Sequence, residues 1–185
     1  MNNHIYNREA YNKYTQVPNF SYKIIEHLMT NEKAETLWKL IKYNDANAYD
    51  KPNLTQEEKA ALIYKGVGTQ DEFSVFLDYM STDANYTVKT ILRIYPGDTT
   101  PITRTTGIQG INIEVFVEFT INHLADYTTR VDRIVQILLE VLNGADIGGV
   151  GQLFLDESAS HMCRISTIGV SPFKGKQIVM AVNVG

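Results

Sequence analysis

The stretch Ile111-Asn112-Ile113-Glu114-Val115-Phe116-Val117-Glu118-Phe119-Thr120-Ile121-Asn122 carries the strongest strand pattern in the chain. Its odd-numbered positions are aliphatic or aromatic, and its even-numbered positions are polar except for Phe116. Side chains alternate between the two faces of a strand, so the pattern predicts a long strand over 111–122 with one buried face. Glu114 and Glu118 share the other face, which we expect to be solvated or to form the wall of a ring or channel.

The strongest helix pattern follows this strand and covers residues 127–143. Apolar residues recur there at spacings of three and four, which is typical of an amphipathic helix with a wide apolar stripe. Asp126 is the expected N-cap, and Asn143-Gly144 is the expected end. Two further strands are predicted downstream, over 152–168 with a bend near 158–160 and over 174–184.

Upstream of the long strand, shorter alternating runs predict strands over 73–79 and 86–95. Pro96 has no backbone donor, so we expect the second run to end there. A polar loop is expected from Pro96 to Gly110, with Arg104 as the only charge after Asp98.

The first 66 residues read as mainly helical behind an N-terminal arm. Residues 21–43 predict a helix with a break at Thr30-Asn31, and a capping box over 55–58 predicts a second, short helix that ends near Gly66. Residues 1–20 are rich in Tyr and Asn and show no sustained helix or strand period. Tyr is favoured at interfaces, so we expect the three tyrosines of this arm to dock on a neighbouring subunit or partner: Tyr6, Tyr11 and Tyr14.

The order of these elements predicts an α+β fold. The sheet is expected to be mostly antiparallel and covered by one long helix, 127–143, with a helical N-terminal preface and an extended N-terminal arm. We divide the chain accordingly into an interaction arm over 1–20, a helical preface over 21–66 and an α+β core over 67–185.

The composition narrows the possible classes of protein. The 185 residues hold 17 Lys and Arg against 21 Asp and Glu, a net charge of -4, which argues against a strongly basic nucleic-acid binder. Cys163 is the only cysteine, so an intramolecular disulfide or a multi-thiolate zinc site is excluded and a reducing compartment fits best. No apolar run approaches the roughly 18 residues of a membrane span, so we expect no membrane partner.

Side chains with catalytic potential do not form a recognisable motif. Glu114 and Glu118 could form a carboxylate pair, and His123 with Asp126 could share a metal, but each pair lacks the further groups that such chemistry needs. The residues near Ser158 lack the strained turn of a serine nucleophile. The glycines over 144–151 follow a helix instead of opening one, which is the wrong end for a phosphate. We therefore expect neither enzymatic activity nor a cofactor.

Two stretches resemble proteins of the head–tail joint of tailed bacteriophages. Residues 86–184 resemble the core of tail-terminator and neck proteins, in the order of strand, loop, the strand Ile111 to Val117, and a helix that opens near Tyr127-Thr128-Thr129-Arg130. The resemblance continues through a Gly-rich connection from Asn143-Gly144 to Gly151 and a final pair of strands joined through Phe173-Lys174-Gly175. Residues 31–66, where a Leu/Trp-rich helix runs into Pro52-Asn53-Leu54-Thr55-Gln56-Glu57-Glu58-Lys59, are similar to the helical preface of some neck proteins.

The resemblance implies a structural virion protein that forms a homo-oligomeric ring, commonly six-fold, in the neck. Such a ring ends the tail and joins it to the DNA-filled head. Its partners would be copies of itself, connector, stopper or portal proteins and the tail-tube protein, while DNA passes without specific binding. Assembly would take place in the host cytoplasm and the product would reside in the virion. Glu114 and Glu118 are then candidates for the lumen, and the loop that holds Arg104 can reach an adjacent ring.

Three alternatives stay open on the sequence. A head-completion or stopper protein would occupy the same joint. A small α+β hydrolase or ligand-binding domain would use residues within 156–163 or 114–126. An intracellular interaction module would fold its arm on a partner.

Overall fold

The computed structural model describes residues 16–79, 88–102, 107–155, 163–169 and 171–184. Tyr6, Tyr11, Tyr14 and Arg104 lie outside the described residues, and so do the candidate hydrolase residues 156–162. The expectations for the arm and for Arg104 therefore stay predictions.

The described residues form a seven-stranded, mostly antiparallel sheet, which confirms the predicted α+β class. Its order is β1-β2-β3-β7-β5-β4, with β6 also paired to β7. Only β1 and β2 pair in parallel. The strands are β1 (Val75–Phe76), β2 (Thr90–Pro101), β3 (Gly107–Glu118), β4 (Asp146–Ile147), β5 (Gly151–Phe154), β6 (Arg164–Ile168) and β7 (Phe173–Val184).

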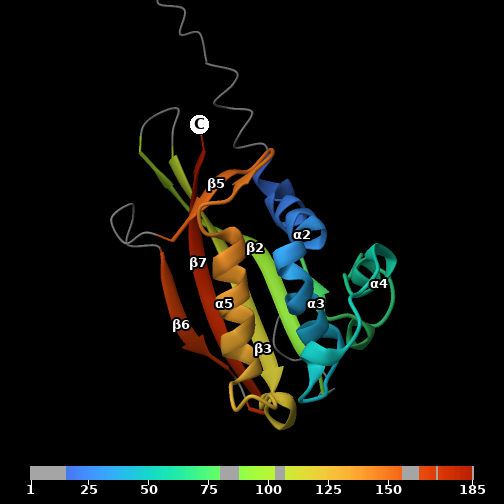
Figure 1. The fold of residues 1–185 in the computed structure, drawn as a ribbon. Coiled ribbons are helices and arrows are strands. Elements are labelled where there is room, and N and C mark those ends of the chain that lie inside the picture. The colour runs from blue at the N-terminus through green and yellow to red at the C-terminus, as the bar shows by residue number, and fades with distance from the viewer. Residues whose placement is uncertain (1–15, 80–87, 103–106, 156–162, 170, 185) are drawn as a thin grey trace, which may run out of the picture.

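Three helices, and not one, cover the same face of the curled sheet (Figure 1). The α-helices are α2 (Phe20–Thr30), α3 (Glu35–Lys42), α4 (Gln56–Ala61) and α5 (Arg130–Leu142). Short 3-10 helices are η1 (Val17–Asn19), η2 (Glu32–Ala34), η3 (Ala48–Asp50), η4 (Gln70–Glu72) and η5 (Phe119–Ile121). The expectation of a single covering helix is wrong, because α2 and α3 present apolar stripes to the same core as α5.

The hydrophobic core lies between these helices and the sheet. It joins fully buried residues of the preface, such as Leu28 and Trp38, to Ile113 of β3 and Leu138 of α5. At roughly 1.5–3 kcal/mol for each large side chain taken out of water, this shared burial is the main stabilising contribution of the preface. The boundaries at residues 20 and 66 stay predictions.

Local signals located several helix ends, but α4 ends at Ala61 and not near Gly66 as expected. Asn31 leaves the helical conformation between α2 and α3, and its side chain accepts a hydrogen bond from the Lys33 backbone N–H. The capping box is present, because Thr55 and Glu58 satisfy each other's backbone N–H groups at the start of α4. The helix α5 is capped by Thr129, not by Asp126 as expected.

The strands β2 and β3 extend into the region 96–110, which was predicted to be a polar loop. The strand β2 runs through Pro96, which pairs with Ile111, and the register shifts between Pro96 and Thr99. The backbone N–H of Leu92 points away from β3, since it donates to the Ser74 carbonyl oxygen. Backbone direction alternates along a strand, so position 96 also points its missing N–H away from β3, and no bond of the β2–β3 ladder is lost.

The predicted strand over 111–122 ends earlier, at Glu118. The Glu118 carboxylate accepts from the Thr120 backbone N–H at 2.9 Å and caps η5, which turns the chain out of the sheet. Of the run over 73–79 only Val75 and Phe76 form a strand.

Candidate functional site

A row of polar residues crosses the face of the sheet opposite the helices. The register places Arg93, Glu114, Gln177 and Ser166 next to one another on β2, β3, β7 and β6. Their neighbours along the strands, such as Leu92 and Val115, point into the helix-covered core. Because strand side chains alternate, the polar row lies on the opposite face.

Glu114 is the centre of this row. Its carboxylate Oε1 accepts from the Tyr95 hydroxyl at 2.7 Å and from Gln177 Nε2 at 3.2 Å. Its Oε2 lies 3.6 Å from a terminal guanidinium nitrogen of Arg93, whose Cζ lies over the Phe116 ring, 4.8 Å from the ring centre. The side chains of Arg93 and Glu114 are only 5% and 9% exposed. The network therefore ties three adjacent strands together in a nearly dry setting.

Burial and the hydrogen bond to Glu114 raise the pKa of the Tyr95 hydroxyl well above its usual value. A phenol that donates to a carboxylate and resists ionisation is a poor nucleophile or general base at neutral pH. The arrangement can hold strands in register, and it does not present a free acid–base pair.

The expectation of a solvated face at Glu114 and Glu118 is wrong, because both residues are 7% exposed. The flanking strands β2 and β7 cover Glu114 with Tyr95 and Gln177, and Glu118 turns back to cap η5. Their assignment to the lumen of a ring stays a prediction.

Aromatic side chains occupy the end of this face next to the polar row. Phe76, Ile91 and Phe116 form a buried cluster against which four partly buried residues pack: Tyr64, Phe73, Ile168 and Phe173. The Lys89 ammonium closes its edge, because it donates to the carbonyl oxygens of Gln70 and Phe73 at 3.2 and 3.0 Å. Burial lowers the pKa of Lys89.

Two open hollows adjoin the aromatic cluster. One measures ≈ 520 Å³ and is lined by Tyr64, Gly66, Gln70, Phe76, Leu77, Asp78 and Tyr79. The other measures ≈ 590 Å³ and is lined by Glu118, Phe119, Thr167, Ile168, Gly169, Ser171, Pro172, Phe173 and Lys174. Both have the volume of a small-molecule site, but both are open to solvent and neither holds several convergent titratable groups among its lining residues.

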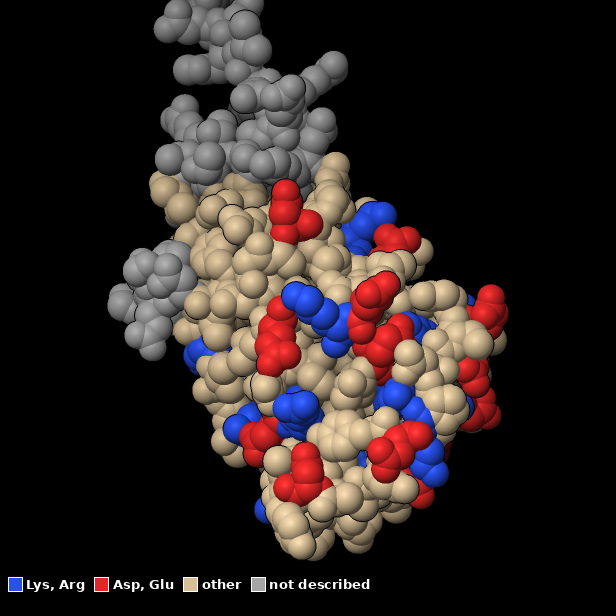
Figure 2. Space-filling model, viewed as in Figure 1, with Lys and Arg blue, Asp and Glu red and all other residues tan. Residues whose placement is uncertain are grey.

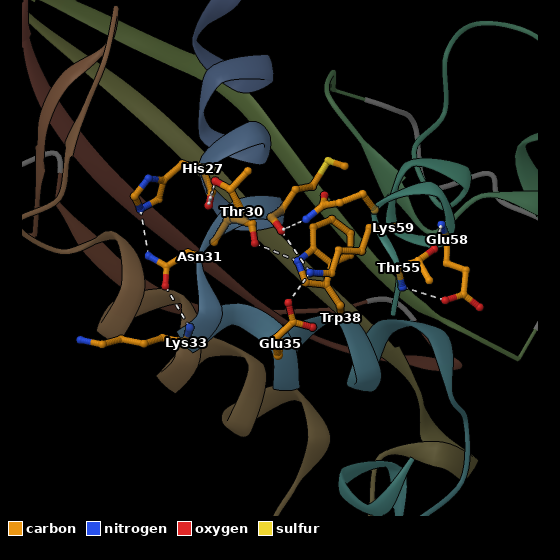
Figure 3. A network of polar contacts seen from close by, with 12 residues as sticks. His27, Thr30, Asn31, Lys33, Glu35, Trp38, Thr55, Glu58 and Lys59 are labelled. Carbon is orange, nitrogen blue, oxygen red and sulfur yellow. Dashed lines mark hydrogen bonds and ion pairs between the residues drawn. The ribbon is translucent and has the colours of Figure 1, made fainter. Parts of the chain in front are cut away.

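A buried lysine links the helices of the preface (Figure 3). Lys59 of α4 is 1% exposed, forms an ion pair with Glu35 of α3 and donates to the Met29 carbonyl oxygen at 3.1 Å. The indole N–H of Trp38 donates to the Leu28 carbonyl oxygen at 2.9 Å nearby. The cluster fixes α4 against the end of α2, a structural role.

A second buried cation, Arg130, joins the preface to α5. Its guanidinium donates to the carbonyl oxygens of Leu40, Tyr43 and Asp45 at 2.7–2.8 Å, at and just beyond the end of α3, and to Ile121 at 2.9 Å. Desolvation lowers the pKa of this guanidinium. Sequence reasoning missed both cations, although Lys59 and Arg130 each occupy a position on the apolar stripe of their helix, which is a readable signal.

The remaining sequence candidates are separated or engaged elsewhere. His123 pairs through its backbone with Thr129 and its ring contacts Phe119, while Asp126 accepts from Thr128. The thiol of Cys163 is buried and donates to the Phe154 carbonyl oxygen at 3.6 Å. In the described ranges, no group of three or more His, Cys, Asp or Glu side chains could hold a metal ion.

Charges of both signs are interspersed over the described part of the helix-covered face (Figure 2). This face therefore does not present the one-sided basic surface typical of a nucleic-acid binder. No helix within the described ranges is long and apolar enough to cross a membrane.

The structure defines a mixed α+β protein with a curled sheet. The polar network around Glu114 holds the strands together, and two solvent-open hollows lie beside the aromatic cluster. A family model described as YomW matches residues 34–182, which is most of the chain, so the protein belongs to the YomW family. The match runs from Ala34, just before α3, to Val182, two residues before the end of β7. The name is typical of proteins from Bacillus phage regions, which indicates a phage origin. No curated protein matches the chain.

Proposed function

We propose that the chain is a structural subunit of a phage neck, which assembles into a homo-oligomeric ring that ends the tail and joins it to the DNA-filled head. The phage origin of the family supports the assignment of the chain to a phage. We expect six copies, contact with tail-tube and connector or portal proteins, passage of DNA without specific binding, and no enzymatic activity. Assembly in the host cytoplasm and residence in the virion follow from the same proposal.

The observation that carries the proposal is a three-stranded tongue at one end of the molecule. We use this name for residues 99–101 of β2, 107–109 of β3 and 182–184 of β7, which stay paired in register. The tongue extends beyond the end of α5 (Figure 1). The tongue is exposed along its β2 edge at Thr99 and Thr100, while its β3 residues and Val182 and Val184 of β7 are buried, so it would meet a neighbouring subunit or ring through that strand edge.

The Gln109 side chain stiffens the base of the tongue. Gln109 is 1% exposed, and its amide donates to the carbonyl oxygens of Gly97 and Gly110 at 2.9 and 2.8 Å. Its Oε1 also accepts from the Thr99 hydroxyl. These bonds bridge the register shift between Pro96 and Thr99 and fix the direction in which the tongue projects.

The proposal is tested by a nonsense mutation in the gene within its phage, with electron microscopy of the lysate. Loss of a terminator removes the stop on tail-tube growth, so we expect overlong tails beside unjoined, DNA-filled heads. Tails of normal length beside heads that have lost DNA would instead identify the head-completion or stopper alternative. Complete, infectious particles would contradict both structural roles and favour the alternative of a hydrolase or ligand-binding domain.

A further inference from the structure

A strained and fully exposed tyrosine stands at the tip of the connection between η5 and α5. Tyr127 has a backbone φ of 64° and is the only non-glycine residue with a positive φ in the described ranges. Its side chain is 98% exposed. A bulky residue in the left-handed region is an outlier, whereas Gly or Asn adopts this conformation at little cost. Because the Tyr127 side chain is almost fully exposed, its packing within the chain does not offset this strain, and the hydrogen bonds of the surrounding backbone hold the conformation.

The surrounding backbone holds Tyr127 in a defined position. We call residues 123–129 the Tyr127 turn. Thr128 donates its backbone N–H and its hydroxyl to Asp126 at 3.1 and 2.6 Å, and the Leu124 N–H donates to the Thr128 carbonyl oxygen at 3.0 Å. The Ala125 N–H anchors the turn to Ala46 at 3.0 Å. A rigid turn that projects one aromatic ring is the form of an interface anchor, because little conformational entropy is lost on docking.

A hollow lined partly by aromatic side chains lies elsewhere on the same chain. We call the hollow lined by Tyr64, Phe76, Leu77 and Tyr79, together with Gln70 and Asp78, the aromatic hollow. Tyr79, which is 66% exposed, and the partly buried Tyr64 can pack edge-to-face against another aromatic ring, and such pairs are favourable beyond their buried area, while Phe76 is 3% exposed. The Asp78 carboxylate, which already accepts from the Tyr79 N–H, keeps further lone pairs for a phenol hydroxyl.

We propose that the Tyr127 turn of one copy inserts its ring into the aromatic hollow of the next copy. The connection between η5 and α5, which holds the turn, lies at the lower end of Figure 1, whereas the segment after α4, which supplies the lining of the hollow, lies at the side of the molecule. A knob and a hollow on different parts of one chain make a heterologous, head-to-tail contact, which closes into a ring when the rotation between copies allows. The inference rests on the proposed function, because it names the subunit contact that such a ring needs.

The first test separates association from folding. Asn tolerates the left-handed conformation, so Tyr127→Asn should abolish the oligomer while the released chain keeps a single cooperative unfolding transition, with an apparent melting temperature lowered by the loss of association. Tyr22 provides the matched control, since it is 53% exposed but lies on α2, and Tyr22→Asn should leave the oligomer intact. Native mass spectrometry and thermal unfolding of both variants supply the two readouts.

The second test locates the contact by cross-linking. Two populations of the full chain, one with Ala125→Cys in the exposed turn beside an intact Tyr127 and one with Gln70→Cys, both in a Cys163→Ser background, are mixed and oxidised. A disulfide-linked dimer in this mixture, but not in either population alone or in a mixture of Tyr22→Cys with Gln70→Cys, supports the inference.

The outcomes distinguish this inference from the neck proposal. If the native chain forms a closed oligomer that Tyr127→Asn preserves, the inference fails and the ring stands. If Tyr127→Asn dissociates the oligomer but no cross-link to position 70 forms, the aromatic hollow is the wrong receptor and the inference is overturned. If the native chain is monomeric under all conditions and its gene is dispensable for complete particles, the neck proposal itself fails.

Discussion

Glu114 is buried in the structure and connects neighbouring strands, although the strand pattern predicts that it is exposed. Its carboxylate receives the Tyr95 hydroxyl, the Gln177 amide and the Arg93 guanidinium, and all four side chains come from the central strands β2, β3 and β7. The desolvation cost of the pair is offset only while each partner stays in place. The residue therefore stabilises the sheet, whatever contacts the assembled protein makes.

We predict that Glu114→Ala lowers the free energy of unfolding by about 3–5 kcal/mol, because it leaves the Arg93 charge buried without its partner. Glu114→Gln should cost less, since an amide oxygen still accepts from Tyr95. Urea denaturation of both variants measures the effect, with Glu140→Ala on the exposed face of α5 as control. A loss below about 1 kcal/mol for Glu114→Ala, as for an ordinary surface residue, would contradict the buried network.

Asp132 provides a pH-dependent contribution at the start of α5. Hydrogen bonds from Lys176 and Thr129 lower the pKa of its carboxyl below the usual value. A depressed folded-state pKa adds stability above the unfolded value near 3.9, and this stability is lost as the pH falls through the folded value. The contribution links α5 to β7 through the 2.5 Å contact between Asp132 and Lys176.

Asp132→Asn should therefore lower the free energy of unfolding by about 0.5 kcal/mol at pH 7, because the pair is largely exposed to solvent. The difference from the native chain should shrink as the pH falls below the unfolded value near 3.9 and vanish once the folded-state carboxyl is also protonated. Unfolding titrations across this range measure it. A double-mutant cycle with Lys176→Met serves as control, and an undiminished effect in that background would refute the assigned pair.

At the scale of the elements, the sequence predicted which segments form helices and strands better than where the sheet extends. The long strand, the break at Thr30-Asn31 and the capping box over 55–58 follow from local signals, and the structure has all three. The continuation of β2 through Pro96 depends on which edge of the strand faces a neighbour. That is a property of the tertiary structure, and the absence of a backbone N–H at Pro96 does not reveal it.

The same limit applies to the candidate site. Alternation correctly placed Glu114 and Glu118 on one face of β3, but burial of that face depends on partners from β2 and β7, which are distant in sequence. The covering layer was also misjudged, since the stripes of α2 and α3 were readable but their packing against the sheet was not. Lys59 and Arg130 could have been suspected from their positions on apolar stripes, yet their carbonyl partners could not.

The tongue is the element whose rigidity the neck proposal needs. We predict that Gln109→Ala lowers the free energy of unfolding by about 2 kcal/mol through the loss of its buried hydrogen bonds. Amide exchange should quicken at the tongue while the core of β3 near Ile113 stays protected, as measured by hydrogen exchange with mass spectrometry.

Gln152→Ala is the matched control for this change, since Gln152 is exposed and makes a single bond of 3.2 Å to the Gly144 carbonyl oxygen. It should leave both readouts unchanged. Equal exchange at the tongue in the native chain and in Gln109→Ala would show that Gln109 does not fix this element.

At the scale of the whole molecule, one face is an apolar core under three helices and the other combines a polar tie, an aromatic cluster and two open hollows. The tongue and the Tyr127 turn project from opposite ends of the body (Figure 1). Copies that contact through such surfaces can assemble side by side while the tongue remains available to the next component of the neck. This arrangement motivates a ring whose function lies in its surfaces.

The most direct test of this account is native mass spectrometry of the purified full chain across a concentration series. The neck proposal predicts one closed oligomer of uniform size, with six copies expected, that persists on dilution because each subunit makes two contacts. A monomer at every concentration, or a ladder of open oligomers without a preferred size, would contradict the ring.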